Sequence, residues 1–212
     1  MKLAVIIFHK NVDQYPKNWI ERCIESIKLQ SHPNFTVFEL DYGGDGTQIS
    51  EGSEFESLKL KNHAEAHNYL LDKVFDLGFD YAFNTNVDDY YDFTRVEKQL
   101  RYLKLGFDVV SSNFIHIDEQ GNFIRKMIFH NRDIKQEAKR NHNIIAHPVC
   151  AYSKKFWKEC TKLNGEQIPR DDFELWKRSF KDFKFIIVPE FLLYYRIHKN
   201  NSGNGNINRK LN

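Results

Sequence analysis

Two adjacent acids follow an apolar stretch near the middle of the chain. Residues 80–83 have the composition of the end of a strand, and the polar cluster after them contains Asp88 and Asp89. Side chains at the carboxyl end of a strand in an α/β sheet lie where ligands bind. Neighbouring carboxylates repel each other unless hydrogen bonds or a cation relieve the charge, and a divalent metal carrying a phosphate group would do so. The alternative is an acidic turn that caps the following helix.

A glycine-rich loop follows an earlier predicted strand. Residues 41–47 read Asp-Tyr-Gly-Gly-Asp-Gly-Thr. The three glycines let the backbone approach a ligand closely, and Asp41 stands at the carboxyl end of the strand. The G-x-G-x-x-G spacing is absent, so the loop is not a dinucleotide fingerprint.

The pattern of apolar residues predicts the elements that position these two loops. A continuous apolar run predicts a buried strand at 3–8, helical periodicity predicts a helix at 19–29, and a second strand follows at 35–40. Strand, helix and strand in this order make a right-handed crossover, so the two strands are parallel. The next elements are expected as a loop at 49–57, a helix at 58–77, a strand at 79–84, a helix at 94–105 and a strand at 107–113.

The second half of the chain has shorter elements. Alternating residues around a turn at 118–122 predict a hairpin at 114–129. A strand or strand edge is expected at 144–148, helices at 153–162 and 169–180, and strands at 185–188 and 191–197. The segment 199–212 is rich in Asn and Gly, which predicts a flexible tail.

Composition excludes several classes of protein. The 212 residues are 41% hydrophobic, which indicates one globular domain rather than a disordered chain. A net charge of +2 favours neither nucleic acid nor a membrane as partner. The three cysteines have no metal-type spacing and an odd count, which fits a reducing compartment. The apolar run at 3–8 is too short for a signal peptide or a membrane span, so a soluble, cytoplasmic protein is expected.

Taken in order, the motifs resemble the family 2 glycosyltransferases of the GT-A (Rossmann-like) fold. Residues 8–11 look like the end of the family's opening strand and its loop, and residues 41–47 resemble its D-D-G-S-x-D-x-T loop, with Gly44 replacing a serine. Residues 86–89, Asn-Val-Asp-Asp, are similar to its D-x-D-D metal motif. Finally, residues 170–178 resemble E-D-x-E-L-W-x-R, and residues 194–198 are similar to Y-R-x-H.

The resemblance implies an α/β fold with a mostly parallel central sheet, flanking helices and a small antiparallel C-terminal element. It also implies one catalytic domain at 1–198, divided into a nucleotide-sugar-binding half at 1–110 and an acceptor and catalytic half at 111–198. The implied site residues are Phe8, His9, Lys10, Asp41, His67, Asn68, Asn86, Val87 and Arg196 for the donor, Asp88 and His198 for the metal, and Asp172 and Asp171 for catalysis. The implied cofactor is Mn²⁺ or Mg²⁺.

Asn86 is the main departure from the family pattern, because an acid is usual at this position. Its amide can bond to a ribose hydroxyl, but it is neutral and a poor metal ligand. The metal would then rest on Asp88, the diphosphate of the donor and His198.

The implied reaction is metal-dependent inverting transfer from a nucleotide sugar, a UDP-sugar by the family pattern. The acceptor would be a hydroxyl of a glycan, glycoprotein or lipid-linked sugar, and assembly into a homo-oligomer is left open. The reaction needs a base for the acceptor proton, for which Asp172 is the best candidate, although an acid there can also cap the helix. His147 borders the acceptor or is structural, and Trp176 stacks on a sugar or packs.

Two other functions fit parts of the same pattern. A sugar nucleotidyltransferase also has a glycine-rich loop and acids on an α/β sheet, but it usually carries a basic, glycine-rich signature after the first strand, where this chain has His9-Lys10-Asn11. A binding module could keep a nucleotide-sugar pocket without turnover, although Asp171 and Asp172 would then have no role.

Overall fold

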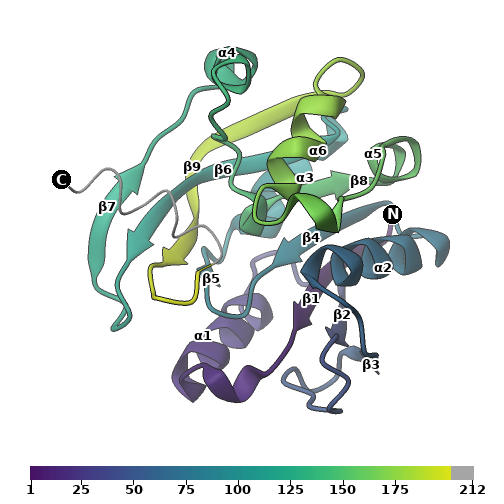
Figure 1. Cartoon of the computed structure of the whole chain (residues 1–212), viewed down its shortest axis with the longest axis vertical. Coiled ribbons are helices and arrows are strands. Elements are labelled where there is room, and N and C mark those ends of the chain that lie inside the picture. Colours follow the sequence, from purple (N-terminus) through teal and green to yellow (C-terminus); the bar gives the residue numbers. More distant parts are fainter. Residues whose placement is uncertain (202–212) are drawn as a thin grey trace.

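The first half of the chain alternates strands and helices around a parallel sheet. The computed structural model describes residues 1–201 (Figure 1). The elements of this half are β1 (Leu3–His9), α1 (Lys17–Lys28), β2 (Thr36–Asp41), β3 (Glu54–Ser57), α2 (His63–Asp76), β4 (Tyr81–Thr85), β5 (Tyr90–Tyr91) and α3 (Arg95–Lys104). Strand β1 pairs in parallel with β2 and β4, as the predicted crossover requires.

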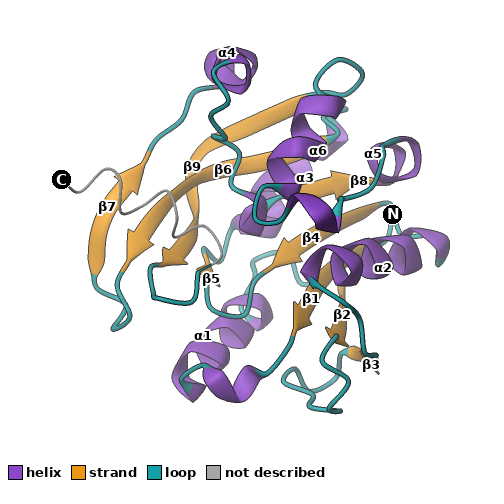
Figure 2. Ribbon diagram, viewed as in Figure 1, coloured by secondary structure: helices purple, strands orange, loops and turns teal. Residues whose placement is uncertain are grey.

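The second half supplies the antiparallel part of the sheet. Its elements are β6 (Val109–Ile117), β7 (Phe123–Met127), α4 (Ile134–Lys139), β8 (Ala151–Ser153), α5 (Lys154–Glu159), α6 (Asp171–Ser179) and β9 (Phe185–Arg196). The strand order is β3-β2-β1-β4-β8-β6-β9-β5, and β7 pairs with β6 (Figure 2). Short β8 is antiparallel to both β4 and β6 and so joins the two halves of the sheet.

Helices cover both faces of this sheet. One buried apolar cluster joins the sheet to α2, α5 and α6, and a second cluster joins the opposite face to α1 and α3. The central strands are apolar on both faces because both are covered. The fold is therefore the mixed α/β class predicted from the sequence.

Five predicted elements differ from the structure. The loop at 49–57 contains β3, and the helix at 58–77 begins only at His63, because the Asn62 side chain accepts a hydrogen bond from the Glu65 amide and caps it there. The strand at 144–148 is wrong, since His147–Val149 form a 3₁₀ turn and the strand lies at β8. The last two predicted strands are one strand, β9, whose pairing with β6 shifts register near Pro189.

Two further expectations concern the ends and the membrane. Part of the expected flexible tail, residues 202–212, lies outside the described residues. In the described part of the chain, no helix combines the length and the apolar character that a membrane span needs.

A buried amide ties α3 to the centre of the sheet. The Gln99 Nε2 donates to the Val110 carbonyl at 2.8 Å and to the Val149 carbonyl at 2.6 Å. Its Oε1 accepts a hydrogen bond from Arg95 Nε at 3.1 Å. Both side chains are fully buried, so each of these partners would lack a bond without the amide.

We expect Gln99→Leu to lower the free energy of unfolding by about 2–4 kcal/mol, because two carbonyls and one guanidinium nitrogen lose their buried partners. Urea denaturation followed by circular dichroism measures the change. Gln136→Leu removes an exposed amide from α4 and is the matched control, with an expected change within about 0.5 kcal/mol. Equal stability of the two variants would contradict the role of Gln99.

Candidate active site

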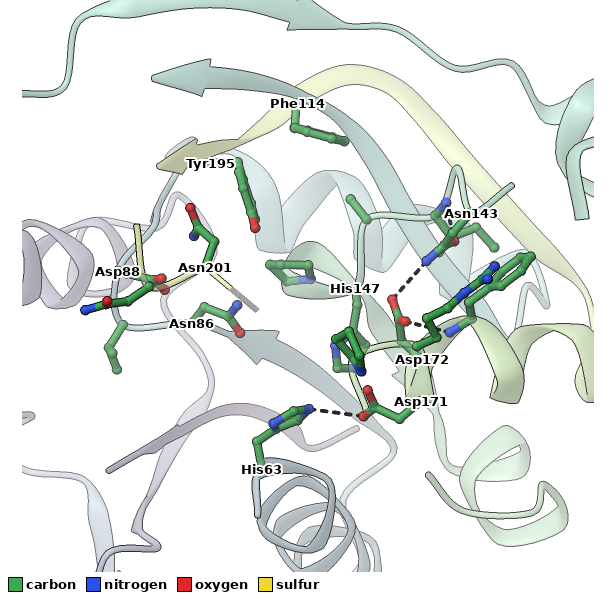
Figure 3. Close-up of a pocket in the computed structure, with 18 of the residues that line it drawn as sticks. His63, Asn86, Asp88, Phe114, Asn143, His147, Asp171, Asp172, Tyr195 and Asn201 are labelled. Carbon is green, nitrogen blue, oxygen red and sulfur yellow. Dashed lines mark hydrogen bonds and ion pairs between the residues drawn. The ribbon is translucent and has the colours of Figure 1, made fainter. Parts of the chain in front are cut away.

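A cleft of about 840 Å³ opens at the carboxyl ends of β1 and β4. Its walls come from the loops after β1 and β4, from one face of β6, β7 and β9, and from the start of α6 (Figure 3). Of the predicted site residues, eight line it: Phe8, His9, Lys10, Asn86, Val87, Asp88, Asp171 and Asp172. The ends of β1 and β4 and the start of α6 thus bring residues from both halves of the chain to one cleft.

Asp41 holds its own loop instead of lining the cleft. One of its carboxylate oxygens accepts hydrogen bonds from the Gly43 and Gly44 amides, and the other accepts them from the Gly46 amide and the Ser57 hydroxyl. Burial acts to raise the pKa of this carboxyl, but the Ser57 and backbone bonds outweigh it and lower the pKa. Asp41, which the family resemblance assigns to the donor site, therefore bonds to its own loop in this structure.

His9 reaches the cleft, but its ring does not point there. Its Nε2 lies 2.9 Å from Glu39 Oε1, and both side chains are buried. Glu39 also accepts hydrogen bonds from the backbone amides of Ile49 and Ser50 and from the Ser53 hydroxyl. This pair fixes the loop between β2 and β3, so His9 supports the wall of the cleft from behind.

Two further predicted donor residues, His67 and Asn68, lie away from the cleft lining. His67 is 1% exposed, and its ring packs at 5.5 Å from Phe8 and 4.8 Å from His147. Burial, with the nearby histidines, lowers the pKa of His67 well below its usual value, so the ring is neutral. Asn68 exchanges two hydrogen bonds with the Leu163 backbone. Both residues belong to the packing of α2.

The Arg196 side chain also bonds within the protein and does not line the cleft. Its Nε donates to the Asp88 carbonyl, and its Nη1 donates to the carbonyls of Asp118 and Glu119. The guanidinium carbon lies 4.6 Å from the centre of the Trp19 ring. Arg196, which the family resemblance assigns to the donor site, therefore ties together the turn after β4 and the hairpin at 118–119.

The structure brings the two predicted metal ligands, Asp88 and His198, together. Asp88 Oδ2 lies 2.9 Å from His198 Nε2, across 110 residues of sequence. The Asn201 Oδ1 accepts a hydrogen bond from the His198 amide and fixes the turn that carries the histidine. Within residues 1–201, no three or more His, Cys, Asp or Glu side chains form a cluster that could hold a metal ion. The Asp88–His198 pair could therefore supply two protein ligands.

Asp89 supports this turn from below the surface. It is 1% exposed, and its Oδ1 accepts a hydrogen bond from the Arg196 amide. Burial, and secondly the charge of Asp88, raise the pKa of Asp89 well above its usual value. The two adjacent acids therefore differ, with Asp88 facing the cleft and Asp89 buried.

The two acids at the start of α6 are also separated by their surroundings. Asp171 forms an ion pair with His63 at 3.2 Å, which outweighs the opposing effect of burial and lowers the pKa of this carboxyl. Burial raises the pKa of Asp172 to about 6. The Asn143 side chain donates to Asp172 Oδ2 at 2.9 Å (Figure 3). The Asn143 bond thus orients the Asp172 carboxyl, and its pKa lies close to neutral pH.

Several cleft residues lack a sequence motif that marks them. Asn143 lies in a segment with weak periodicity, and Phe114, His116 and Phe129 resemble ordinary core aromatics in sequence. Tyr195 stands in the segment similar to Y-R-x-H, but the motif gave it no role. The pairing of β6 with β9, across about 80 residues, brings these side chains to one wall, and only the alternation on β6 hints at it. His147 lines the cleft, and burial lowers its pKa to about 4, whereas Trp176 is fully buried and packs.

Solved structures of similar shape show which fold this is. Staphylococcus aureus TarS residues 1–349 with UDP aligns with a TM-score of 0.65 at 14% identity, over 93% of this chain and 61% of that one. The mannosyltransferase PcManGT of Pyrobaculum calidifontis, solved with GDP-Man and Mn²⁺, aligns with a TM-score of 0.67 at 14% identity, over 98% of this chain and 60% of that one. The chain has the GT-A type of fold and spans about three-fifths of these neighbours.

Sequence similarity identifies the class of enzyme. The O-antigen biosynthesis glycosyltransferase WbnJ of Escherichia coli is 26% identical over 92% of this chain and 80% of its own length. The uncharacterized glycosyltransferase MJ1057 of Methanocaldococcus jannaschii is 32% identical over 49% of this chain and 37% of its own length. No protein-family model matches the chain. The protein is a glycosyltransferase.

The Asn143–Asp172 contact makes a prediction that does not depend on turnover. Because the amide hydrogen bond favours the ionised carboxylate, Asn143→Ala should raise the pKa of Asp172 above its value of about 6. Carbon-detected NMR titration of the aspartate carboxyl groups measures the shift. His142→Ala, whose side chain bonds to Glu137 instead, is the control and should leave the titration of Asp172 unchanged. A downward shift in Asn143→Ala would contradict the geometry.

Proposed function

We propose that the protein is a metal-dependent inverting glycosyltransferase of family 2 that uses a UDP-sugar as donor. The observation that supports this most is that Asp172, with its raised pKa, and Asp88, bonded to His198, line the same cleft. A base and a cation-binding pair in one cleft are what transfer from a nucleotide sugar requires.

The donor would lie over the carboxyl ends of β1 and β4. Phe8, Tyr42 and Lys10 all line the cleft, and the centres of the two aromatic rings lie 6.4 Å apart. The rings could pack against the nucleotide base, and the Lys10 ammonium could bind the diphosphate. TarS was solved with UDP and with UDP-GlcNAc, and PcManGT with GDP-Man. These neighbours support a nucleotide-sugar donor, and the motif pattern favours uracil as its base.

The Asp88–His198 pair suits a divalent cation. A carboxylate oxygen and an imidazole nitrogen 2.9 Å apart can bind one ion together, and the diphosphate of the donor would complete its shell. The Asn86 amide stands beside them at the cleft surface. When bound, Mn²⁺ or Mg²⁺ supplies positive charge that stabilises the leaving nucleoside diphosphate.

The protein residues then divide the transfer between them. The acceptor hydroxyl oxygen forms a bond to the anomeric carbon of the donor, the bond from that carbon to the diphosphate oxygen breaks, and the hydroxyl proton moves to the Asp172 carboxylate. Above about pH 6, Asp172 is ionised and can accept this proton. Asn143 holds the carboxylate in place, and Asp171, paired with His63, stays charged beside it.

The first test follows the base. Asp172→Asn should abolish acceptor-dependent UDP release from the UDP-sugar that the wild type uses, and it should leave the affinity for UDP nearly unchanged, because the base acts on the acceptor. A coupled UDP assay and calorimetric titration with UDP measure the two effects. Glu174→Gln, two residues along α6 and paired with Arg178, is the control and should remain active.

The outcomes separate the proposed function from its alternatives. Full activity of Asp172→Asn would place the base elsewhere. Binding of UDP without release from any UDP-sugar would favour a binding module. Release of diphosphate from a nucleoside triphosphate would favour a sugar nucleotidyltransferase.

The second test follows the metal. Asp88→Ala should weaken Mn²⁺-dependent binding of UDP by about tenfold or more, because one of two protein ligands is lost. Titration calorimetry with UDP, in Mn²⁺ and in excess chelator, measures it. Asp80→Ala removes an acid from the opposite end of β4 and should bind UDP as the wild type does. UDP affinity that is the same with and without chelator in the wild type would contradict the metal assignment.

A further inference from the structure

An aromatic wall borders the cleft on the side of the late strands. We define the aromatic wall as Phe114, His116, Phe129 and Tyr195, which all line the cleft. Phe114 and His116 alternate along β6 and therefore face the same way, and His116 pairs across the sheet with Tyr195 of β9. The Phe114 ring centre lies 5.9 Å from that of Phe129 and 6.0 Å from that of Tyr195.

One cation stands at the edge of the aromatic wall. Arg125 of β7 pairs with His116 of β6, so it lies on the same face of the sheet, and it lines the cleft. Its Nε donates to His116 Nδ1 at 3.1 Å. Burial, and secondly the charge of Arg125, lower the pKa of His116 to about 4, so the ring is neutral and can accept this bond. The contact holds the guanidinium beside the rings.

The acids of the cleft do not neutralise this cation. Asp88 pairs with His198, Asp171 with His63, and Asp172 with Asn143. Among residues 1–201, Arg125 has no ion-pair partner. An exposed guanidinium with open N–H groups at the edge of a cleft is suited to a planar anion such as a carboxylate, or to a phosphate.

The aromatic wall also lies where the second substrate must enter. Figure 3 shows Phe114 and Tyr195 across the pocket from Asp171 and His63, with the Asn143–Asp172 pair at its side. In the same view, Asp88 and Asn86 lie on one side of the pocket and the Asn143–Asp172 pair on the other, with Tyr195 and Phe114 along the edge between them. A pyranose ring presents a face of C–H groups that packs well against aromatic side chains.

We propose that the aromatic wall and Arg125 bind an acceptor sugar that carries an acidic group, either a ring carboxylate or a phosphate. The sugar face packs on Phe114 and Tyr195, and the acidic group bonds to the guanidinium of Arg125. This selects an anionic glycan acceptor over a neutral one. The inference rests on the proposed function, since it names the acceptor class of that transferase.

Direct binding tests the inference without requiring turnover. The probes are a matched set: methyl glucoside, methyl glucuronoside and glucose 1-phosphate, added to the protein already saturated with UDP and Mn²⁺ and followed by protein-observed NMR. We expect one or both anionic probes to bind about tenfold more tightly than the neutral glucoside. Arg125→Gln should remove this preference, since about tenfold is the effect of losing one charge-assisted hydrogen bond. Which anionic probe binds more tightly distinguishes the carboxylate from the phosphate.

Lys126→Gln is the matched control. It removes the same charge from the next residue of β7, but Lys126 pairs with Ile115 on the other face of the sheet and lies over the Phe191 ring. This variant should keep the preference for anionic probes. Equal affinity for neutral and anionic probes in the wild type, or an unchanged preference in Arg125→Gln, would overturn the inference. The proposed function fails separately, if UDP release never occurs with any acceptor.

Discussion

The cleft depends on one attachment, by which the end of β9 is bonded to the turn after β4. The Arg196 amide donates to the buried Asp89 carboxylate, and its guanidinium donates to the Asp88 carbonyl and to the hairpin carbonyls at 118 and 119. Arg196 thus joins the end of β9 to the turn after β4 and to the hairpin at 118–119. These bonds fix the positions of Asp88 and His198 relative to each other. A buried carboxyl such as Asp89 is costly in isolation, and these bonds offset that cost.

The same principle explains why some acids serve the fold and others serve the cleft. Asp41 and Glu39 both lie at the end of β2, and backbone amides and hydroxyls occupy their oxygens. Such bonds fix a loop that has little regular structure of its own. Asp88 and Asp172 line the cleft and have fewer partners. Asp88 contacts His198 through one oxygen, and each oxygen of Asp172 accepts one bond, from the Phe173 amide and from the Asn143 side chain, so lone pairs remain for a ligand or a proton.

Sequence patterns predicted the long elements well and the contacts of single side chains less well. The apolar runs of β1, β2 and β4 and the periodicity of α1 and α3 were sufficient, because burial alone determines them. Strands β3 and β8 were missed because runs of four and three residues carry no periodicity and form only beside a paired neighbour. Asp88 and Asp41 each follow a strand, so the sequence predicted both as ligand-binding residues. It does not reveal that the Asp41 carboxylate bonds to backbone amides instead. His67 and Arg196 lie outside the cleft lining for the same reason, because each has partners within the fold that the sequence does not reveal.

The neighbouring acids Asp171 and Asp172 show how one turn of helix provides two functions. Despite its burial, the contact with His63 lowers the pKa of Asp171, while burial, and with it the charge of Asp171, raises the pKa of Asp172 to about 6. Asp171 therefore acts through its neighbour, by making the Asp172 carboxylate a stronger base than an exposed aspartate. Asn143 opposes this effect with its hydrogen bond and fixes the direction in which the carboxylate points. Asn143 therefore affects both orientation and basicity, whereas burial and the charge of Asp171 act on basicity alone.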